Sequence, residues 1–396
     1  MKSIPIYLFM DAMGWEIVQN YHFLESELPF RYPVQMQFGY SSTAIPTILT
    51  GKYPREHNHF SFYYYDPEHS PFKIFRYLKF FFGAGLHPHC LLNRGRVRGY
   101  ISRFFAKWKG YTGYFQLYSV PYDKLPFFDY CEKEDIFAPR GLAPLENLHD
   151  ILLKSGLRFH ISNWRLSESE NIDIAEKLLL QKKIDFAFIY TAEFDSFLHD
   201  HIFDQELIKE RVETYASRIK RFLLNLHTAQ INFRFHIISD HGMTPTKSTC
   251  NLMSKLKALP LIFGKDYASL FDSTMARFWY LTPKAKELIQ SRLQQADCPG
   301  YFLSQEEKIR YGIDFKNNRF GDDIFLMDTG IQIEPCDLGA KALKGMHGYH
   351  PQDKDSYAAW LSTHQPYFIP TEVKDYFTLM KNNILQLQSE HSSRQK

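Results

Sequence analysis

The amino-acid sequence predicts an α/β protein with a largely parallel central sheet that carries helices on both faces. Short apolar runs rich in β-branched and aromatic residues alternate with segments whose apolar residues recur at helical spacing, as in such sheets. The 396 residues suffice for one large domain with an elaboration or for two domains. The net charge of +3 is too small to indicate nucleic acid as a partner.

The expected elements follow in chain order. The first apolar run is too short for a secretory signal and ends in the carboxylate of Asp11, so we interpret it as a buried strand. The predicted elements are strand Ile4–Met10, helix Leu145–Lys154, strand Phe159–Asn163, strand Phe186–Tyr190, helix Leu207–Leu226, strand Phe233–Ser239, strand Ala276–Leu281, strand Ile324–Met327, helix Val373–Gln388 and a frayed tail at Ser389–Lys396.

One segment departs from this pattern. Between His69 and Tyr122 the sequence has no acidic residue, and basic residues alternate with aromatic ones. We therefore predict a basic-aromatic insertion or cap over residues 61–140, between the two parts of a main domain at 1–60 and 141–388, with 389–396 as the tail. Its basic and aromatic residues include Lys73, Phe75, Arg76, Lys79, Phe80, Phe81, Phe82, Arg94, Arg96, Arg98, Tyr100, Arg103, Phe104, Phe105, Lys107, Trp108 and Lys109.

This segment has more than one interpretation. It can bind a polyanionic or lipid-linked glycan phosphate, or contact anionic headgroups as a peripheral membrane surface through residues 72–109. The alternative is an ordinary helical insertion with its aromatic side chains packed inward. No motif of nucleic-acid-binding proteins accompanies it, so we predict no specific nucleic-acid partner.

Cysteine usage and hydropathy bear on location. The five cysteines are scattered and form no CxxC pair, which favours free thiols in a reducing compartment. No apolar run approaches the roughly 20 residues that span a bilayer. We expect a cytoplasmic protein, with peripheral contact at the inner membrane face if the basic segment binds lipid. Oligomeric state is not predicted.

Acidic residues and histidines follow several of the predicted strands. In an open α/β sheet the site lies beyond the carboxyl ends of the strands, so these positions are informative. Asp195 and His199 are four residues apart and share one face of a helical turn. Asp240 and His241 are adjacent, so in extended backbone their side chains point in different directions. The residues in question are Asp11, Asp195, His199, Asp240, His241 and His347, the last in a glycine-flanked loop.

These side chains have the chemistry of metal ligands. Carboxylates and imidazoles without thiolates suit zinc, manganese or iron(II), and six such groups are enough for two neighbouring ions that share a substrate oxygen. A single DxxxH or DH pair is more often structural, but nothing structural requires acids and histidines to recur after successive strands.

Several segments together resemble a known family. They are "LTGKYPREHN" at Leu49–Asn58, "DSFLH" at Asp195–His199, "SDHGM" at Ser239–Met243 and "MHGYH" at Met346–His350. The sequence resembles the alkaline phosphatase superfamily, and within it the type I phosphodiesterase or nucleotide pyrophosphatase/phosphodiesterase branch. The resemblance implies an alkaline-phosphatase-like fold and two divalent ions, zinc in preference to manganese. It implies one ion on Asp195, His199 and His347, and the other on Asp11, the nucleophile, Asp240 and His241.

The stretch "GYSSTAIPTILTG" at 39–51 offers three consecutive hydroxyls, Ser41, Ser42 and Thr43. A serine hydroxyl needs a base or a metal to become a nucleophile at neutral pH. In the superfamily the nucleophile lies ten residues before the glycine that closes its helix, so counting from Gly51 selects Ser41. Because proline fits best in a first helical turn, a helix that begins nearer Thr43 would favour the runner-up, Ser42. Helix capping is the structural alternative.

The resemblance implies a function. The leading hypothesis is a two-metal phosphodiesterase or pyrophosphatase that hydrolyses a phosphate ester or phosphoanhydride through a phosphoserine. The alternatives are a phosphatase or phospho-alcohol transferase acting on a surface-polysaccharide or lipid-linked intermediate, and a non-catalytic metal-stabilised binding protein. Sulfate-ester hydrolysis is disfavoured because the residues after Ser41 lack the sulfatase frame. No substrate-binding residue is predicted.

Overall fold

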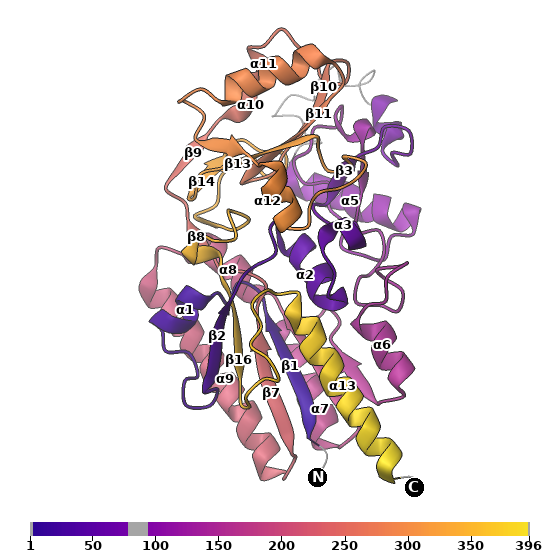
Figure 1. Ribbon diagram of the computed structural model, residues 1–396, viewed down its shortest axis with the longest axis vertical. Coiled ribbons are helices and arrows are strands. Elements are labelled where there is room, and N and C mark those ends of the chain that lie inside the picture. The colour runs from indigo at the N-terminus through magenta and orange to yellow at the C-terminus, as the bar shows by residue number, and fades with distance from the viewer. Residues whose placement is uncertain (1–2, 78–93, 395–396) are drawn as a thin grey trace. The chain divides into compact units, whose positions relative to one another are not determined.

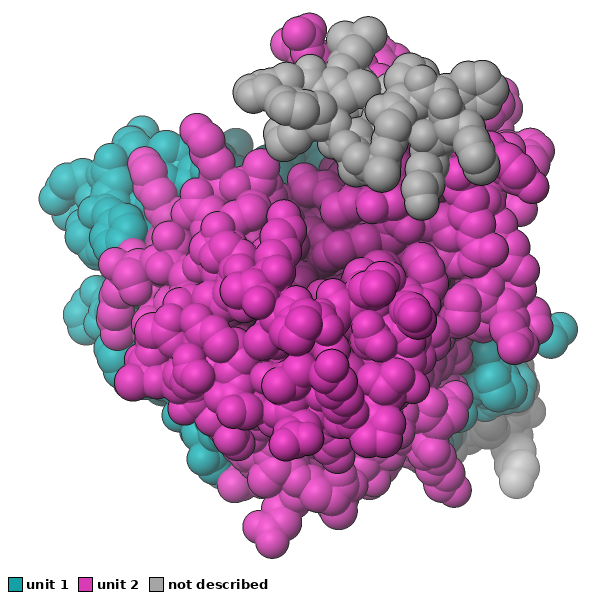
Figure 2. Space-filling model, turned by 90° about the horizontal axis from the view of Figure 1, so that it is seen from above, with its two compact units in different colours: residues 1–53, 136–245, 350–396 teal, residues 54–135, 246–349 magenta. Residues whose placement is uncertain are grey.

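The computed structural model describes residues 3–77 and 94–394, and these divide into two compact units. Unit 1 comprises residues 1–53, 136–245 and 350–396, and unit 2 comprises 54–135 and 246–349. Figure 2 draws unit 1 in teal and unit 2 in magenta. Lys79, Phe80, Phe81 and Phe82 of the basic-aromatic segment, and Cys90 among the five cysteines, lie outside the described residues.

Unit 1 is built on a mixed sheet, which confirms the predicted fold class. In the described residues the sheet has six strands, and β16 is antiparallel to both of its neighbours whereas the other pairs are parallel. The strand order is β2 (Phe30–Val34), β16 (Ala358–Ser362), β7 (Phe233–Ile238), β1 (Ile4–Met10), β6 (Phe186–Thr191) and β5 (Phe159–Ile161).

Helices cover both faces of this sheet (Figure 1). Successive residues of β1 point to opposite faces, so Leu8 joins one apolar core and Phe9 joins the other. The first core includes residues of α1 (Trp15–Asn20), α7 (Glu168–Leu180), α8 (Glu193–His201) and α9 (Gln205–Thr228). The second includes residues of α2 (Ser41–Thr50), α6 (Leu148–Ser155) and α13 (Asp375–Arg394). Strand β8 (Thr244–Pro245) and the 3₁₀ helix η4 (Lys354–Ser356) complete the unit.

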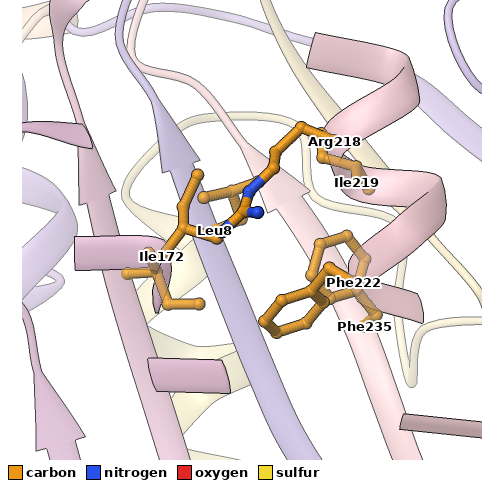
Figure 3. Close-up of a pocket in the computed structure, with 7 residues that line it drawn as sticks. Leu8, Ile172, Arg218, Ile219, Phe222 and Phe235 are labelled. Carbon is orange, nitrogen blue, oxygen red and sulfur yellow. The ribbon is translucent and has the colours of Figure 1, made fainter. Parts of the chain in front are cut away.

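A small apolar cavity lies under helix α9 of unit 1 (Figure 3). Its lining is aliphatic and aromatic apart from Arg218, whose guanidinium pairs with Asp173 and Glu176. Because it borders the middle of β1 and β7 rather than their ends, we interpret it as a packing gap. The lining residues are Leu8, Ile172, Ile189, Arg218, Ile219, Phe222 and Phe235.

Unit 2 contains an antiparallel sheet of β10 (Tyr267–Phe271), β11 (Met275–Tyr280), β13 (Asp323–Met327) and β12 (Gly300–Phe302), in that order. A buried ion pair lies in it, with Nε of Arg277 2.8 Å from Asp272. The remaining elements are α3 (Pro54–His57), β3 (Tyr63–Tyr65), η1 (Lys73–Tyr77), α5 (Gly95–Lys109), η3 (Leu125–Phe127), β4 (Phe128–Tyr130), β9 (Ser248–Cys250), α10 (Leu252–Lys257), α11 (Pro283–Leu293), α12 (Gln305–Arg310), β14 (Ile331–Ile333) and β15 (Gly345–Met346).

Some element boundaries differ from those that the sequence predicts. Helix α6 begins at Leu148 rather than Leu145, because the Asn147 side chain accepts the backbone N–H of Asp150 and caps the helix there. Helix α13 continues to Arg394 instead of fraying after Gln388. The predicted insertion at 61–140 falls mostly in unit 2, where it is joined by residues 246–349.

Candidate metal centre

Three neighbouring strands of unit 1 bring the predicted acidic residues and histidines to one edge of the sheet. Strand β1 pairs in parallel with β7 on one side and with β6 on the other. Asp11 directly follows β1, Asp240 and His241 lie in the loop after β7, and β6 leads into helix α8. Because parallel strands end at the same edge, side chains distant in sequence meet there.

Asp11, Asp240 and His241 form a compact group whose ligand atoms all lie within 4.8 Å of one another. Nε2 of His241 lies 3.5 Å from Oδ1 of Asp11 and 3.3 Å from Oδ2 of Asp240. A ligand atom of Asp195 lies within the same 4.8 Å of one of His241. Asp11, Asp240 and His241 are all buried, so little water screens their charges.

The hydrogen bonds of His241 determine which ring nitrogen faces the carboxylates. Nδ1 lies 2.9 Å from the carbonyl oxygen of Gly242, which can only accept, so in the neutral ring Nδ1 carries the proton. Nε2 then directs its lone pair toward Asp11 and Asp240. When both acids are ionised, this lone pair and the two carboxylates repel one another unless a proton or a cation lies among them. The group therefore fits a divalent metal ion.

The acids of this group are hard to ionise by themselves. Burial, followed by the charges of Asp240 and Asp195, raises the pKa of Asp11 well above its usual range. Burial also raises the pKa of Asp240, although His241 opposes the shift. Oδ1 of Asp11 and Oδ2 of Asp240 are buried and accept no hydrogen bond from the described residues. A bound cation would compensate both oxygens and keep the carboxylates charged.

Two glycines allow the loops after β1 and β7 to approach each other. A Cβ atom on Gly14 would collide with Cα of Gly242, and one on Gly242 would collide with the carbonyl oxygen of Asp355. The backbone N–H of Ala12 donates to Oδ1 of Asp240 at 3.3 Å, which links the two loops directly. This close contact positions Asp11 beside Asp240.

Ser41 is the first residue of helix α2, and its Oγ lies 3.0 Å from Nε2 of His241. The preceding residue, Tyr40, has extended backbone, so the helix begins at Ser41. The N-terminus of a helix presents backbone N–H groups and the positive end of the helix dipole, both of which favour a phosphate group. Ser41 therefore lies where a phosphoryl group would be attracted.

The other two hydroxyls of the stretch have different surroundings. Oγ of Ser42 is buried and has no hydrogen-bond partner in the described part of the chain. Oγ1 of Thr43 accepts the backbone N–H of Tyr40 at 3.4 Å and belongs to the helix cap. Pro46 lies in the second turn, where it lacks the N–H that would reach the Ser42 carbonyl. The helix tolerates this loss and begins at Ser41, the hydroxyl that contacts His241.

Asp195 and His199 lie one turn apart on helix α8, with Nε2 of His199 3.3 Å from Oδ2 of Asp195. The start of α8 is held by Glu168 of helix α7, whose Oε1 accepts the backbone N–H of Glu193 at 2.6 Å. The Tyr215 hydroxyl of α9 donates to the other oxygen of Glu168, also at 2.6 Å. The sequence did not indicate Glu168 or Tyr215, because neither follows a strand or belongs to a motif.

His347 lies in unit 2, directly after β15, and is buried. The structure therefore brings Asp11, Ser41, Asp195, Asp240 and His241 together within unit 1, with His199 paired to Asp195. The part of His347 in the centre stays a prediction.

Solved structures show a similar fold. Murine ectonucleotide pyrophosphatase/phosphodiesterase 5 has a TM-score of 0.66 at 15% identity, over 97% of this chain and 95% of that chain. An inactive variant of the same murine protein in complex with AMP has a TM-score of 0.65 at 15% identity, over the same shares of the two chains. The human protein has a TM-score of 0.64 at 13% identity, over 96% of this chain and 94% of that chain. These identities establish the fold alone. No curated protein matches the chain at a significant level.

A family model settles the relationship that the sequence motifs indicate. The model, described as type I phosphodiesterase / nucleotide pyrophosphatase, matches residues 39–350, well over half of the chain. The matched range contains Ser41, Asp195, Asp240 and His347, whereas Asp11 precedes it. The family is one of hydrolases that typically depend on divalent metals, and the buried acids and histidine described above suit such ions. The chain belongs to the type I phosphodiesterase/nucleotide pyrophosphatase family.

Proposed function

We propose that the protein hydrolyses a phosphate diester or phosphoanhydride through a covalent phosphoserine at Ser41. The observation that carries this proposal is the position of Ser41, with Oγ 3.0 Å from Nε2 of His241 at the N-terminus of α2. Two buried carboxylates, Asp11 and Asp240, lie within 3.5 Å of the same ring nitrogen. Membership of a phosphodiesterase family supports the reaction class.

In this proposal the centre holds two divalent ions. Asp11, Ser41, Asp240 and His241 would hold one, and the second would bind Asp195, His199 and His347. Oxygen and imidazole nitrogen donors without thiolates suit zinc first and manganese second. When bound, such ions lower the pKa of a serine hydroxyl and neutralise charge on phosphoryl oxygens.

The side chains and the helix divide the remaining work. The proton of Ser41 leaves to solvent, Oγ forms a bond to phosphorus, and the bond from phosphorus to the leaving oxygen breaks, so that the leaving group departs with the electron pair and takes up a proton from solvent as its pKa requires. The N–H groups of the first turn of α2 stabilise the phosphoryl oxygens. Water then attacks phosphorus and releases phosphate monoester, which regenerates Ser41. The hydrogen bond from Nδ1 of His241 to Gly242 keeps the imidazole oriented throughout.

The structural relatives support a substrate class. The murine structural neighbour was solved with AMP, which supports a nucleotide or another small phosphate ester as the ligand of this chain. A cytoplasmic location is part of the proposal, and the free thiols of Cys131, Cys250, Cys298 and Cys336 suit a reducing compartment.

The test compares a bis-aryl phosphodiester with a mono-aryl phosphate for wild type, Ser41→Ala and Ser42→Ala, together with bound metal content. We expect wild type to prefer the diester and Ser41→Ala to lose at least about a thousandfold in kcat while retaining metal. Ser42→Ala, the matched control, should stay within about tenfold of wild type.

Acid quenching during turnover followed by peptide mass spectrometry should place the phosphoryl group on Ser41. A phosphate on Ser42, or loss of turnover in Ser42→Ala alone, would show that the nucleophile is misassigned. Faster cleavage of the monoester would replace the proposal with a phosphatase. Wild type that binds metal and cleaves neither ester would favour a binding protein.

A further inference from the structure

Helix α5 of unit 2, Gly95–Lys109, carries a row of large aromatic side chains on its outer side. Tyr100, Phe104 and Trp108 are 67%, 73% and 55% exposed. Their spacing of four residues places them along one face of the helix. Residues of this size are usually well buried, so three exposed in a row indicate a surface that contacts something else.

The opposite side of α5 is packed firmly. The ring of Phe105 stacks on Phe72 and Phe75, with centroids 5.1 and 5.8 Å apart. The buried guanidinium of Arg98 donates to the carbonyl oxygens of Leu117 and Val120. These contacts determine the rotation of the helix, so the outward direction of the aromatic row is not the result of loose packing.

Positive charge accompanies the aromatic row. Arg96, Arg103 and Lys107 are exposed on the same side of the helix, each three or four residues from an exposed aromatic ring. The guanidinium of Arg103 lies 4.6 Å from the ring centre of Tyr100. No acidic residue occurs in the sequence between His69 and Tyr122, so no nearby carboxylate of this segment offsets the charge.

We propose that this surface, the α5 face of Arg96, Tyr100, Arg103, Phe104, Lys107 and Trp108, binds the surface of an anionic lipid bilayer. Aromatic rings partition into the boundary between headgroups and acyl chains, and arginine and lysine bind anionic headgroups. A soluble polyanion would engage the bases but gain nothing from Phe104. An acidic protein partner lacks the apolar layer beneath its charges.

The contact would be peripheral. No helix in residues 3–77 and 94–394 has the length and apolar character that a bilayer span requires. Each base near an anionic surface contributes roughly a fivefold increase in the partition constant, and two or three together give a reversible association. The inference does not depend on the proposed hydrolysis, since α5 and the acids at the ends of β1 and β7 belong to different units.

The test is sedimentation of the full chain with vesicles of phosphatidylcholine alone or mixed with phosphatidylserine. We expect pelleting with the mixed vesicles only, weakened by salt. Two triple variants probe the α5 face: Tyr100→Ser with Phe104→Ser and Trp108→Ser, and Arg96→Gln with Arg103→Gln and Lys107→Gln. Each should lower the partition constant at least about tenfold, without changing hydrolysis of a soluble ester.

A matched control removes exposed apolar side chains elsewhere, through Leu224→Ser, Ile262→Ser and Ile309→Ser, whose residues are 63%, 59% and 52% exposed. It should pellet like wild type. The contribution of Trp108 to the fluorescence is the difference between wild type and Trp108→Phe. Its emission should shift to shorter wavelength when anionic vesicles are added. Equal pelleting of wild type and both triple variants would overturn the proposal. Heparin binding that needs the three bases but not the three aromatic side chains would also overturn it. Self-association of the chain without lipid that both triple variants abolish would do the same, because the α5 face would then bind a second copy.

Discussion

At the scale of single residues, the centre in unit 1 concentrates negative charge where the protein interior disfavours it. Asp11 and Asp240 are buried, each has an oxygen that accepts no hydrogen bond from the described residues, and Asp195 adds to their repulsion. An arrangement of this kind costs stability in the metal-free protein and is compensated when a cation binds.

Asp240→Asn should separate these two effects. The amide oxygen can still accept the N–H groups of Ala12 and His241, which lie 3.3 and 3.1 Å from Oδ1 of Asp240, while the charge is removed. We expect metal-free Asp240→Asn to be more stable than metal-free wild type by about 1 kcal/mol, at pH above the raised pKa of the acid. We also expect loss of metal binding and activity. Urea unfolding with a chelator and metal titration measure the two quantities.

A buried acid with a cationic partner is the matched control. Asp272 is as buried as Asp240 but lies 2.8 Å from Nε of Arg277. Asp272→Asn should therefore destabilise the protein by several kcal/mol, on the order of 3. If both variants change the free energy of unfolding in the same direction, charge repulsion does not explain the behaviour of Asp240.

At the scale of elements, the predictable strands are those with a continuous apolar run. Strand β1 was predicted with its observed ends, and β6 and β7 within one residue, because central parallel strands are buried on both faces. Strands β2 and β16 were not predicted. β2 contains Pro33, which argues against a strand, and β16 is short and begins with two alanines. β2 and β16 pair with each other although they are far apart in the sequence, so no local sequence pattern indicates their pairing.

The candidate site shows the same division. Its residues at the ends of β1 and β7 follow from strand prediction, because topology carries them to one edge. The start of α2 is less directly encoded, since Pro46 favours a later start, whereas counting from Gly51 selects Ser41, the hydroxyl that contacts His241 in the structure. Glu168 and Tyr215 meet through the packing of three helices, which no sequence spacing encodes.

Helix α8 gives a prediction at this scale. It has no side-chain cap of its own; instead Glu168 accepts the backbone N–H of Glu193 in its first turn, and Tyr215 donates to Glu168. Tyr215→Phe removes one hydrogen bond from Glu168 and should loosen the helix that carries Asp195 and His199. We expect divalent metal affinity to fall about tenfold with a small change in the free energy of unfolding.

Calorimetric metal titration measures the affinity. A second variant, Tyr215→His, retains a hydrogen-bond donor at this position and should recover part of the lost metal affinity. Tyr21→Phe is the control, since the Tyr21 hydroxyl donates to Gln205 at 2.6 Å on the exposed side of the unit. An equal loss of affinity in both variants would mean that the Tyr215 bond has no special role in positioning α8.

At the scale of the whole molecule, the basic-aromatic segment is part of a larger unit. Tyr63 and Phe72 share one apolar core with Leu270 and Trp279 from the later part of the chain. The inward-packing interpretation thus holds for Phe75 and Phe105, which belong to that core, whereas the outer face of α5 remains exposed. Composition alone could not distinguish these two sets, because both alternate with bases in the sequence.

Buried acids in both units predict how stability depends on pH. In unit 2 burial, with some repulsion from Asp135, raises the pKa of Glu132 from 4.5 to about 8. The folded state then holds a proton that the unfolded state releases, so stability falls as pH rises from about 4.5 and levels off above about 8. Asp11 and Asp240, whose folded pKa values are also raised, add a fall of the same sign in the metal-free protein.

A metal ion held by Asp11 and Asp240, as proposed above, would keep both acids ionised in the folded state and abolish their share of the fall. The stability gained from metal should therefore grow with pH. Glu132→Gln removes the share of Glu132 and should make the loaded protein more stable than loaded wild type at pH 8, with little difference near pH 5. Thermal unfolding of wild type and of Glu132→Gln from pH 5 to pH 9, each with metal or with chelator, gives four curves of stability against pH. Their differences cancel the opposite contributions of His57 and His59, whose pKa values burial lowers. Parallel loaded and metal-free curves in Glu132→Gln would show that Asp11 and Asp240 do not bind the metal as carboxylates.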